Sequence, residues 1–186
     1  MTLDIGLVGY GAWGRMHAAA IARLPGLRLA AIVANGDASA AAASSDHPGV
    51  PVLRTLGALL ARRDIALVDI VAPNHLHAYF ALAALDAGKP VLLEKPLATN
   101  LADGERLAEA VARTGLFLAV GFELRVSRQW AKVKALIDDG TVGRPRFANL
   151  ALFRRPFRPG SGGWRRDRAR VGSWILEEPV HYLDLL

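Results

Sequence analysis

The fold is decided by a stretch close to the N-terminus, residues 3–21, which runs LDIGLVGYGAWGRMHAAAI. Ile5 to Val8 is an apolar run of the length that a buried parallel strand needs. The alanine-rich segment from Arg15 onward contains no proline or glycine and is typical of a helix. Between them lies a turn with three glycines in the spacing G-x-G-x-x-G. The stretch therefore predicts a strand, a glycine turn and a helix.

Each glycine of this turn has its own expected role. Gly9 permits the tight turn, Gly11 lets the backbone approach a pyrophosphate, and Gly14 allows the helix to pack closely on the strand. Free N–H groups at the start of the helix would face the phosphates, where the helix dipole also favours negative charge. The alternative is a plain glycine-rich turn with no ligand, but the strand–turn–helix context favours a dinucleotide site.

The composition limits the class of protein. A chain of 186 residues with 52% hydrophobic residues can form one full core and part of another. No apolar run approaches the roughly 20 residues of a membrane span, and no secretory signal precedes the first strand, so we expect a soluble protein. The sequence has no cysteine, which excludes disulfides, thiolate metal sites and a cysteine nucleophile and agrees with a cytoplasmic location.

The positive charge is concentrated late in the chain. The net charge is +6, and nine arginines fall between Arg144 and Arg170, opposed there only by Asp167. They could form a nucleic-acid patch, or they could hold an anionic cofactor or substrate or pair with acidic groups elsewhere in a larger assembly. Because no DNA- or RNA-binding motif accompanies them, we favour the second interpretation.

Strands and helices alternate as far as residue 121. Further strands are expected at residues 27–34, 50–53, 65–72, 90–93 and 116–121, and helices at 38–45, 56–63, 79–87 and 101–114. This alternation predicts an α/β fold with a Rossmann-type doubly wound parallel sheet and helices on both faces.

The residue after the second strand bears on the choice of cofactor. An Asp or Glu about 20 residues past the glycine turn normally holds the hydroxyls of the adenosine ribose. Asn35 stands at this position, followed by Gly36 and Asp37. A neutral Asn would not repel a 2′-phosphate, which favours NADP slightly over NAD, whereas Asp37 argues the other way.

Polar residues also follow the strand expected at 65–72. Pro73 stops this strand after Ala72, and Asn74, His75 and His77 come next, at the sheet edge where open α/β folds bind ligands. Two histidines could suggest a metal, but no carboxylate or third histidine stands near them. Helix capping and contact with a cofactor are the favoured roles, and no metal is expected.

The next strand ends in the charged pair Glu94-Lys95, which Pro96 follows. A charged pair at the carboxyl end of a parallel strand points into the same crevice as the glycine turn. A solvated surface lysine is the alternative for Lys95.

The pattern changes beyond Glu123. A helix is expected at residues 129–138 and an alternating strand from Arg146 to Phe153. Pro179 can open a helix on which His181 and Asp184 share a face. This helix stops about two turns in, so we expect the chain to be a C-terminally truncated form of a longer protein.

These motifs, taken in order, resemble the glucose-fructose oxidoreductase, inositol dehydrogenase and rhizopine-catabolism (Gfo/Idh/MocA) family. They are Gly9 to Gly14, Pro73-Asn74, His77, Glu94-Lys95-Pro96, Arg125, and Glu177 with His181-Tyr182-Leu183-Asp184. The resemblance implies an NAD(P)-binding Rossmann domain over residues 1–122. Residues 123–186 would be the beginning of an α+β substrate and oligomerisation domain with a mostly antiparallel sheet.

The resemblance also implies roles for individual residues. Lys95 corresponds to the family lysine beside the nicotinamide and the substrate hydroxyl, and His181 to the catalytic histidine. Glu177 stands where the family has an acidic partner of that histidine, with Glu178 as an alternative because Pro179 replaces a common glycine. The expected cofactor-binding residues are Gly9, Tyr10, Gly11, Ala12, Trp13, Gly14, Asn35, Ala72, Pro73, Asn74, His77, Glu94 and Lys95.

The implied function is hydride transfer between NAD or NADP and a secondary alcohol of a sugar, polyol or related small molecule. Such chemistry needs a base, a cation for the developing alkoxide and a nicotinamide, and His181 and Lys95 can supply the first two. Two alternatives stay open: an NAD-dependent glycoside hydrolase of the same fold, and a cofactor-binding but inactive fragment. The full-length form is expected to form homo-oligomers through the second-domain sheet.

Overall fold

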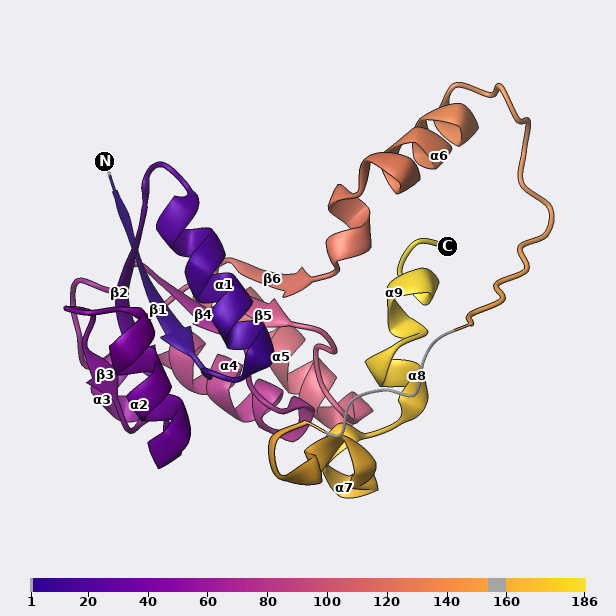
Figure 1. Ribbon diagram of the computed structural model, residues 1–186. Helices are drawn as coiled ribbons and strands as arrows, with labels where there is room; N and C mark the ends of the chain where they lie inside the picture. The colour runs from indigo at the N-terminus through magenta and orange to yellow at the C-terminus, as the bar shows by residue number, and fades with distance from the viewer. Residues whose placement is uncertain (1, 154–159) are drawn as a thin grey trace.

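A computed structural model describes residues 2–153 and 160–186 and contains a six-stranded, all-parallel sheet (Figure 1). The strands lie in the order β3-β2-β1-β4-β5-β6. Their bounds are β1 (Leu3–Val8), β2 (Leu27–Val33), β3 (Val52–Leu53), β4 (Leu67–Ile70), β5 (Val91–Glu94) and β6 (Leu118–Gly121). The predicted Rossmann-type sheet is confirmed.

Helices follow every strand of this sheet. The α-helices are α1 (Ala12–Arg23), α2 (Asp37–Asp46), α3 (Leu56–Leu60), α4 (His77–Asp86), α5 (Leu101–Thr114), α6 (Arg128–Asp138), α7 (Arg168–Val171), α8 (Trp174–Glu177) and α9 (Val180–Leu183). The described residues also contain the 3₁₀ helices η1 (Asn74–Leu76), η2 (Glu123–Val126) and η3 (Ser161–Arg166). Helix α1 begins three residues earlier than expected, because Gly14 lies inside its first turn.

The sheet has a hydrophobic core on each face because successive strand residues point in opposite directions. Ile5 and Leu7 of β1 pack with α1 and α2, whereas Val8 belongs to the core that includes α3, α4 and α5. Both cores use residues that are almost completely inaccessible, such as Leu7 and Leu59. The sheet is therefore buried on both sides, as its near-continuous apolar strands require.

The topological switch point lies between β1 and β4. The chain proceeds from β1 outward through β2 to β3, then crosses back to β4 and proceeds the other way to β6. In such sheets the helices on either side of the switch diverge, and ligands bind in the crevice at the carboxyl ends of the two strands. The glycine turn after β1 and Val71 after β4 lie against each other at this switch point.

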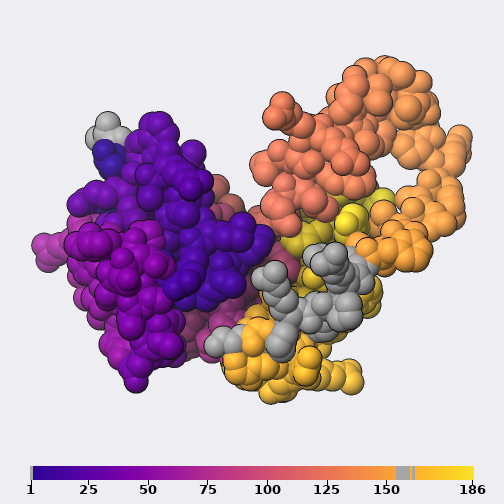
Figure 2. All heavy atoms as spheres, in the orientation of Figure 1, coloured from indigo at the N-terminus to yellow at the C-terminus, as the bar shows by residue number. Residues whose placement is uncertain are grey.

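The segment after β6 has a different character. Helix α6 has no buried residue, and Figures 1 and 2 show it and the chain that follows as an arch that stands away from the sheet. The expected strand from Arg146 to Phe153 is wrong: these residues have no regular secondary structure. A strand needs a neighbouring strand for its N–H and C=O groups, and no described segment pairs with this one.

Helices α7, α8 and α9 return to the carboxyl end of the sheet (Figure 1). They supply the only described residues after position 122 that are buried, namely Val171, Glu177 and His181. Among the helices of the described ranges, none is both long and apolar enough to cross a membrane.

Candidate cofactor and active site

The glycine turn has the geometry that its spacing predicts. Gly9 has a φ of 101°, and a Cβ there would lie 2.1 Å from the carbonyl oxygen of Val71 on the neighbouring strand end. A Cβ on Gly14 would lie 2.2 Å from the carbonyl oxygen of Gly9. Both positions exclude any side chain, since they hold the turn against β4 and α1 against the turn.

Gly11 differs from the other two glycines. Its φ of −85° and ψ of −166° are open to any residue, and nothing lies within 4 Å of a Cβ built there. The fold itself therefore does not require a glycine at position 11. An open position in front of a helix N-terminus fits a pyrophosphate that approaches the backbone.

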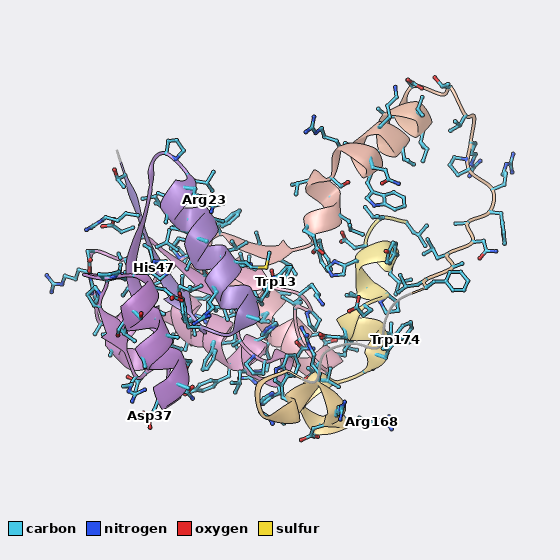
Figure 3. The ribbon with its side chains drawn as sticks, viewed as in Figure 1. Trp13, Arg23, Asp37, His47, Arg168 and Trp174 are labelled. Carbon is cyan, nitrogen blue, oxygen red and sulfur yellow. The ribbon has the colours of Figure 1, made fainter. Side chains whose placement is uncertain are left out.

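The start of α1 offers donors to such a group. The first helical hydrogen bond runs from the N–H of Arg15 to the carbonyl of Gly11, at 3.0 Å. The N–H groups of Ala12, Trp13 and Gly14 precede it and have no acceptor within the helix. Figure 3 shows Trp13 at this end of α1, toward the C-terminal helices, and Arg23 at the opposite end. The turn and the helix therefore fit the phosphates of a dinucleotide.

Tyr10 lies within the turn but points away from this space. Its ring is 4% exposed and packs in the core beneath α1 and α2, and its hydroxyl donates to Asp46 at 2.9 Å. Burial, followed by the hydrogen bond to Asp46, raises the pKa of Tyr10 to about 12. The side chain thus anchors the turn, and only the backbone of Tyr10 faces the expected cofactor.

At the end of β2, Asn35 is exposed and has a cation beside it. Arg54 follows β3 and donates from Nη1 to the carbonyl oxygens of Ala34 and Asn35, each at 3.3 Å. Its Nη2 pairs with the carboxylate of Asp37, the first residue of α2, which Figure 3 labels. Arg54 belongs to no motif of the sequence, and only the parallel pairing of β2 with β3 places it beside the end of β2.

The residues after β4 act as structural ties. His77 is fully buried, and its Nδ1 and Nε2 lie 2.6 Å from the carbonyl oxygen of Pro96 and 2.8 Å from that of Ala72. Burial lowers the pKa of His77 despite these carbonyls, so the neutral ring can donate to only one of them at a time. The cofactor contact expected of His77 stays a prediction. The imidazole holds the end of β4 against the Lys95-Pro96 peptide bond, which is cis.

Asn74 is likewise buried, at 3% exposure, and its expected contact with a cofactor also stays a prediction. Its side-chain amide donates to the carbonyl oxygen of Val171 and to Oε2 of Glu177, both at 3.0 Å. Asn74 therefore joins the sheet to α7 and α8. Pro73, between Ala72 and Asn74, caps η1 and remains partly exposed at the crevice.

Glu94 belongs to a charged cluster beneath the glycine turn. His17 of α1 contacts Asp69 of β4 through Nδ1 at 2.9 Å and Glu94 through Nε2 at 3.2 Å. Burial alone would lower the pKa of His17, but the hydrogen bonds to the two carboxylates outweigh it and raise the pKa to about 10. Burial would raise the pKa of Glu94, yet hydrogen bonds from His17 and Trp13 bring it below its usual value. The imidazolium thus ties α1 to β4 and β5.

Neither His17 nor Asp69 was identified from the sequence. His17 lies one helical turn past Gly14, and Asp69 is the single charged residue within an otherwise apolar strand, which is itself a signal of a buried polar contact.

Lys95 lies at the carboxyl end of β5 and is half-buried. Its Nζ donates to the backbone carbonyl of Glu177 at 2.5 Å. This bond reaches from the sheet to α8, so the structure brings two of the predicted catalytic residues together, although through the backbone of Glu177.

The carboxylate of Glu177 does not face His181 as expected. It is 1% exposed, with Oε2 on Asn74 and Oε1 2.6 Å from Nε of Arg165. Both oxygens are therefore engaged with other partners. The sequence could not show this, because Asn74 lies far from Glu177 along the chain and no motif links Arg165 to Glu177.

His181 instead faces a carboxylate from η2. Its Nδ1 lies 3.2 Å from Oε2 of Glu123, and its ring packs edge-on against Phe122. Burial lowers the pKa of His181, the charge of Lys95 lowers it further, and Glu123 and Glu178 oppose both effects. The ring is thus neutral at physiological pH and can accept a proton.

The family of the chain is settled by its first 122 residues. Residues 3–122 match the Gfo/Idh/MocA family, which is described as an oxidoreductase family with an NAD-binding Rossmann fold. The chain belongs to this family. The resemblance inferred from the motifs is therefore confirmed.

Individual Gfo/Idh/MocA proteins extend this finding. Inositol 2-dehydrogenase from Gluconacetobacter diazotrophicus is 40% identical over 146 residues, which are 77% of this chain and 43% of that protein. Levoglucosan dehydrogenase from Pseudarthrobacter phenanthrenivorans is 30% identical over 194 residues, covering 98% of this chain and 50% of that protein. The chain thus spans about half the length of the curated relatives it matches.

One solved structure of the family was determined with its ligands. Scyllo-inositol dehydrogenase from Lactobacillus casei, with bound NAD(H) and scyllo-inositol, superposes with a TM-score of 0.72 at 30% identity. The match covers 77% of this chain and 43% of that one.

Within residues 2–153 and 160–186 of the present chain, no group of three or more metal-ligating side chains could hold a metal ion.

Proposed function

We propose that this chain is the N-terminal portion of an NAD(P)-dependent oxidoreductase that transfers a hydride between nicotinamide and a secondary alcohol of a polyol or sugar. The observation that carries the proposal is the hydrogen bond from Lys95, at the carboxyl end of β5, to the backbone carbonyl of Glu177, four residues before His181. Family membership and polyol dehydrogenases among the relatives support it.

The proposed division of labour follows the change of pattern after β6. Residues 1–122 form the cofactor-binding domain, and residues 123–186 belong to a substrate and oligomerisation domain. In the full-length form this second domain would join copies of the protein into a homo-oligomer. We place the protein in the cytoplasm on its cysteine-free sequence.

Two side chains would act on the substrate hydroxyl. The ammonium of Lys95 would hold the alcohol oxygen and stabilise the charge that develops when its proton leaves. His181 would accept that proton at Nε2, while Glu123, which faces Nδ1, would stabilise the imidazolium that forms. A bound nicotinamide would accept the hydride. Because its carboxylate is engaged elsewhere, we assign Glu177 the role of positioning Lys95 through its backbone carbonyl.

The cofactor would be held by the glycine turn and the strand ends. Gly9 and Gly14 shape the turn, Gly11 leaves room for the pyrophosphate, and the N–H groups at the start of α1 face it. We propose that NADP(H) binds at least as well as NAD(H), because Asn35 places no carboxylate against a 2′-phosphate.

Polyol-dependent reduction of NAD⁺ or NADP⁺ tests this function. The chain would be assayed at high protein concentration with inositols and levoglucosan. We expect slow turnover that falls by roughly 10²- to 10⁴-fold in His181→Ala, the usual contribution of a general base. Lys95→Ala should be similarly impaired, whereas Lys134→Ala, which removes an exposed lysine of α6, should have no effect. Turnover that persists in Lys95→Ala would contradict the assignment.

A further inference from the structure

The end of β3 places a cation where the adenosine ribose of a dinucleotide would lie. Val33 pairs with Leu53 in the parallel register of β2 and β3, so the next residues, Ala34 and Arg54, are neighbours. Arg54 is thus adjacent to Asn35, the position that normally holds the ribose hydroxyls. This arginine comes from a neighbouring strand and is not part of the turn that follows β2.

The guanidinium of Arg54 is fixed by two carbonyls and one carboxylate. Nη1 donates to the carbonyl oxygens of Ala34 and Asn35, and Nη2 pairs with Asp37. The carbonyls belong to the two residues that directly follow β2, and neither depends on the anion that the guanidinium meets. The side chains of Arg54 and Asp37 are 52% and 95% exposed, which makes their ion pair readily exchangeable.

Resting on the proposed function, we propose that Arg54 binds the 2′-phosphate of NADP and that Asp37 occupies the guanidinium when no phosphate is present. A phosphate carries up to two negative charges and three acceptor oxygens, so it competes well against a single exposed carboxylate. Ser39 lies in the first turn of α2, two residues after Asp37, and its hydroxyl donates to the carbonyl of Gly36. Asp37 then opposes NADP binding both by holding Arg54 and by its own charge.

The proposed role of Arg54 and Asp37 predicts different effects on the two cofactors, which a simple surface ion pair does not. Removing Arg54 should weaken NADPH binding and leave NADH binding unchanged. Removing the charge of Asp37 should have the opposite effect on NADPH, because it frees Arg54. A role in stability alone would change the affinity for both cofactors together.

Fluorescence titration of the whole chain with NADPH and with NADH tests the proposal. We expect Arg54→Gln to weaken NADPH binding by roughly 10- to 100-fold, as for loss of a hydrogen bond to a charged group, with NADH within about twofold. Asp37→Asn should strengthen NADPH binding by about 3- to 10-fold and leave NADH within about twofold, an effect that shrinks at high salt. The matched control is Arg28→Gln, which removes an exposed arginine at the amino end of β2, where it pairs with Asp4.

The assignment of Arg54 would be overturned if Arg54→Gln changed the affinities for NADPH and NADH equally, or changed neither. The proposed function would stay intact in both cases. The same holds if Asp37→Asn leaves NADPH binding unchanged. Failure of the parent chain to bind both dinucleotides would instead contradict the proposed function. Calorimetry with 2′,5′-ADP and 5′-AMP adds a readout free of the nicotinamide, and only the first should lose affinity in Arg54→Gln.

Discussion

The sheet region, residues 3–121, and the segment after it differ in how they are held together. The first buries a hydrophobic core on each face of the sheet. Of the described residues in the second, only Val171, Glu177 and His181 are buried, and polar bonds from Asn74 and Lys95 hold the segments that carry the first two. The first region thus specifies its own structure, whereas α7 and α8 of the second depend on contacts with the first.

The comparison predicts a large difference in resistance to protease. Opening the sheet region requires the free energy of global unfolding, typically 5–15 kcal/mol, whereas exposed segments open at almost no cost. Limited proteolysis should therefore cut first within about residues 125–145 and leave an N-terminal fragment that resists cleavage. Mass spectrometry of the products would locate the cuts, and first cleavage within β1 to β5 would contradict the comparison.

A substitution that breaks the sheet region itself should have the next largest effect. Gly9→Val places a side chain on the carbonyl of Val71 in a left-handed backbone conformation, so we expect a loss of more than about 3 kcal/mol in the free energy of unfolding. Denaturant unfolding would measure it. Gly57→Val is the control, because its Cβ meets open space within a short helix; equal stability of the two variants would show that the turn is not packed as described.

The charged cluster of His17 predicts a dependence of stability on pH. The pKa of His17 is about 10 in the folded chain and 6.5 when unfolded, so its contribution is complete below pH 6.5 and disappears as the pH rises through 10. Between pH 7 and pH 10 the parent should lose up to about 3 kcal/mol more than His17→Asn. Chemical denaturation at both values would show this. His47→Asn serves as the control, and matching slopes for the parent and His17→Asn would refute the imidazolium tie.

The smallest effect concerns cofactor choice at the end of β2. Asn35→Asp restores the carboxylate that favours NAD, so the ratio of NADPH to NADH affinity should fall by about tenfold, or about 1.4 kcal/mol. Titration with both cofactors measures the ratio. A strong NADH preference in the parent chain would contradict the assignment.

The sequence was sufficient where structure depends on local pattern. The glycine spacing, the buried strands and the alternation of elements predicted the sheet, because each residue type there meets a requirement of its own strand or turn. The alternation between Arg146 and Phe153 failed because a strand also needs a partner, which no residue within the strand can indicate.

The sequence did not predict the contacts between distant elements. Arg54 and His17 acquire their roles from strand register and helix placement, and neither belongs to a local motif. The same reason explains why Glu177 was expected beside His181. The family resemblance implied that pairing, but Asn74 and Arg165 engage the carboxylate.

The assignment of the glycine turn as the cofactor site has a direct test. The parent chain and Gly11→Val are titrated with NADPH and NADH, and nicotinamide fluorescence reports binding. Position 11 accepts a side chain without strain, so the variant should melt at the parent temperature. The new side chain would occupy the space of the pyrophosphate, and we predict that the affinity for NADPH and NADH falls by at least roughly 100-fold, comparable to losing about two charge-assisted hydrogen bonds. Unchanged affinity in a folded Gly11→Val chain would show that the glycine turn is not the cofactor site.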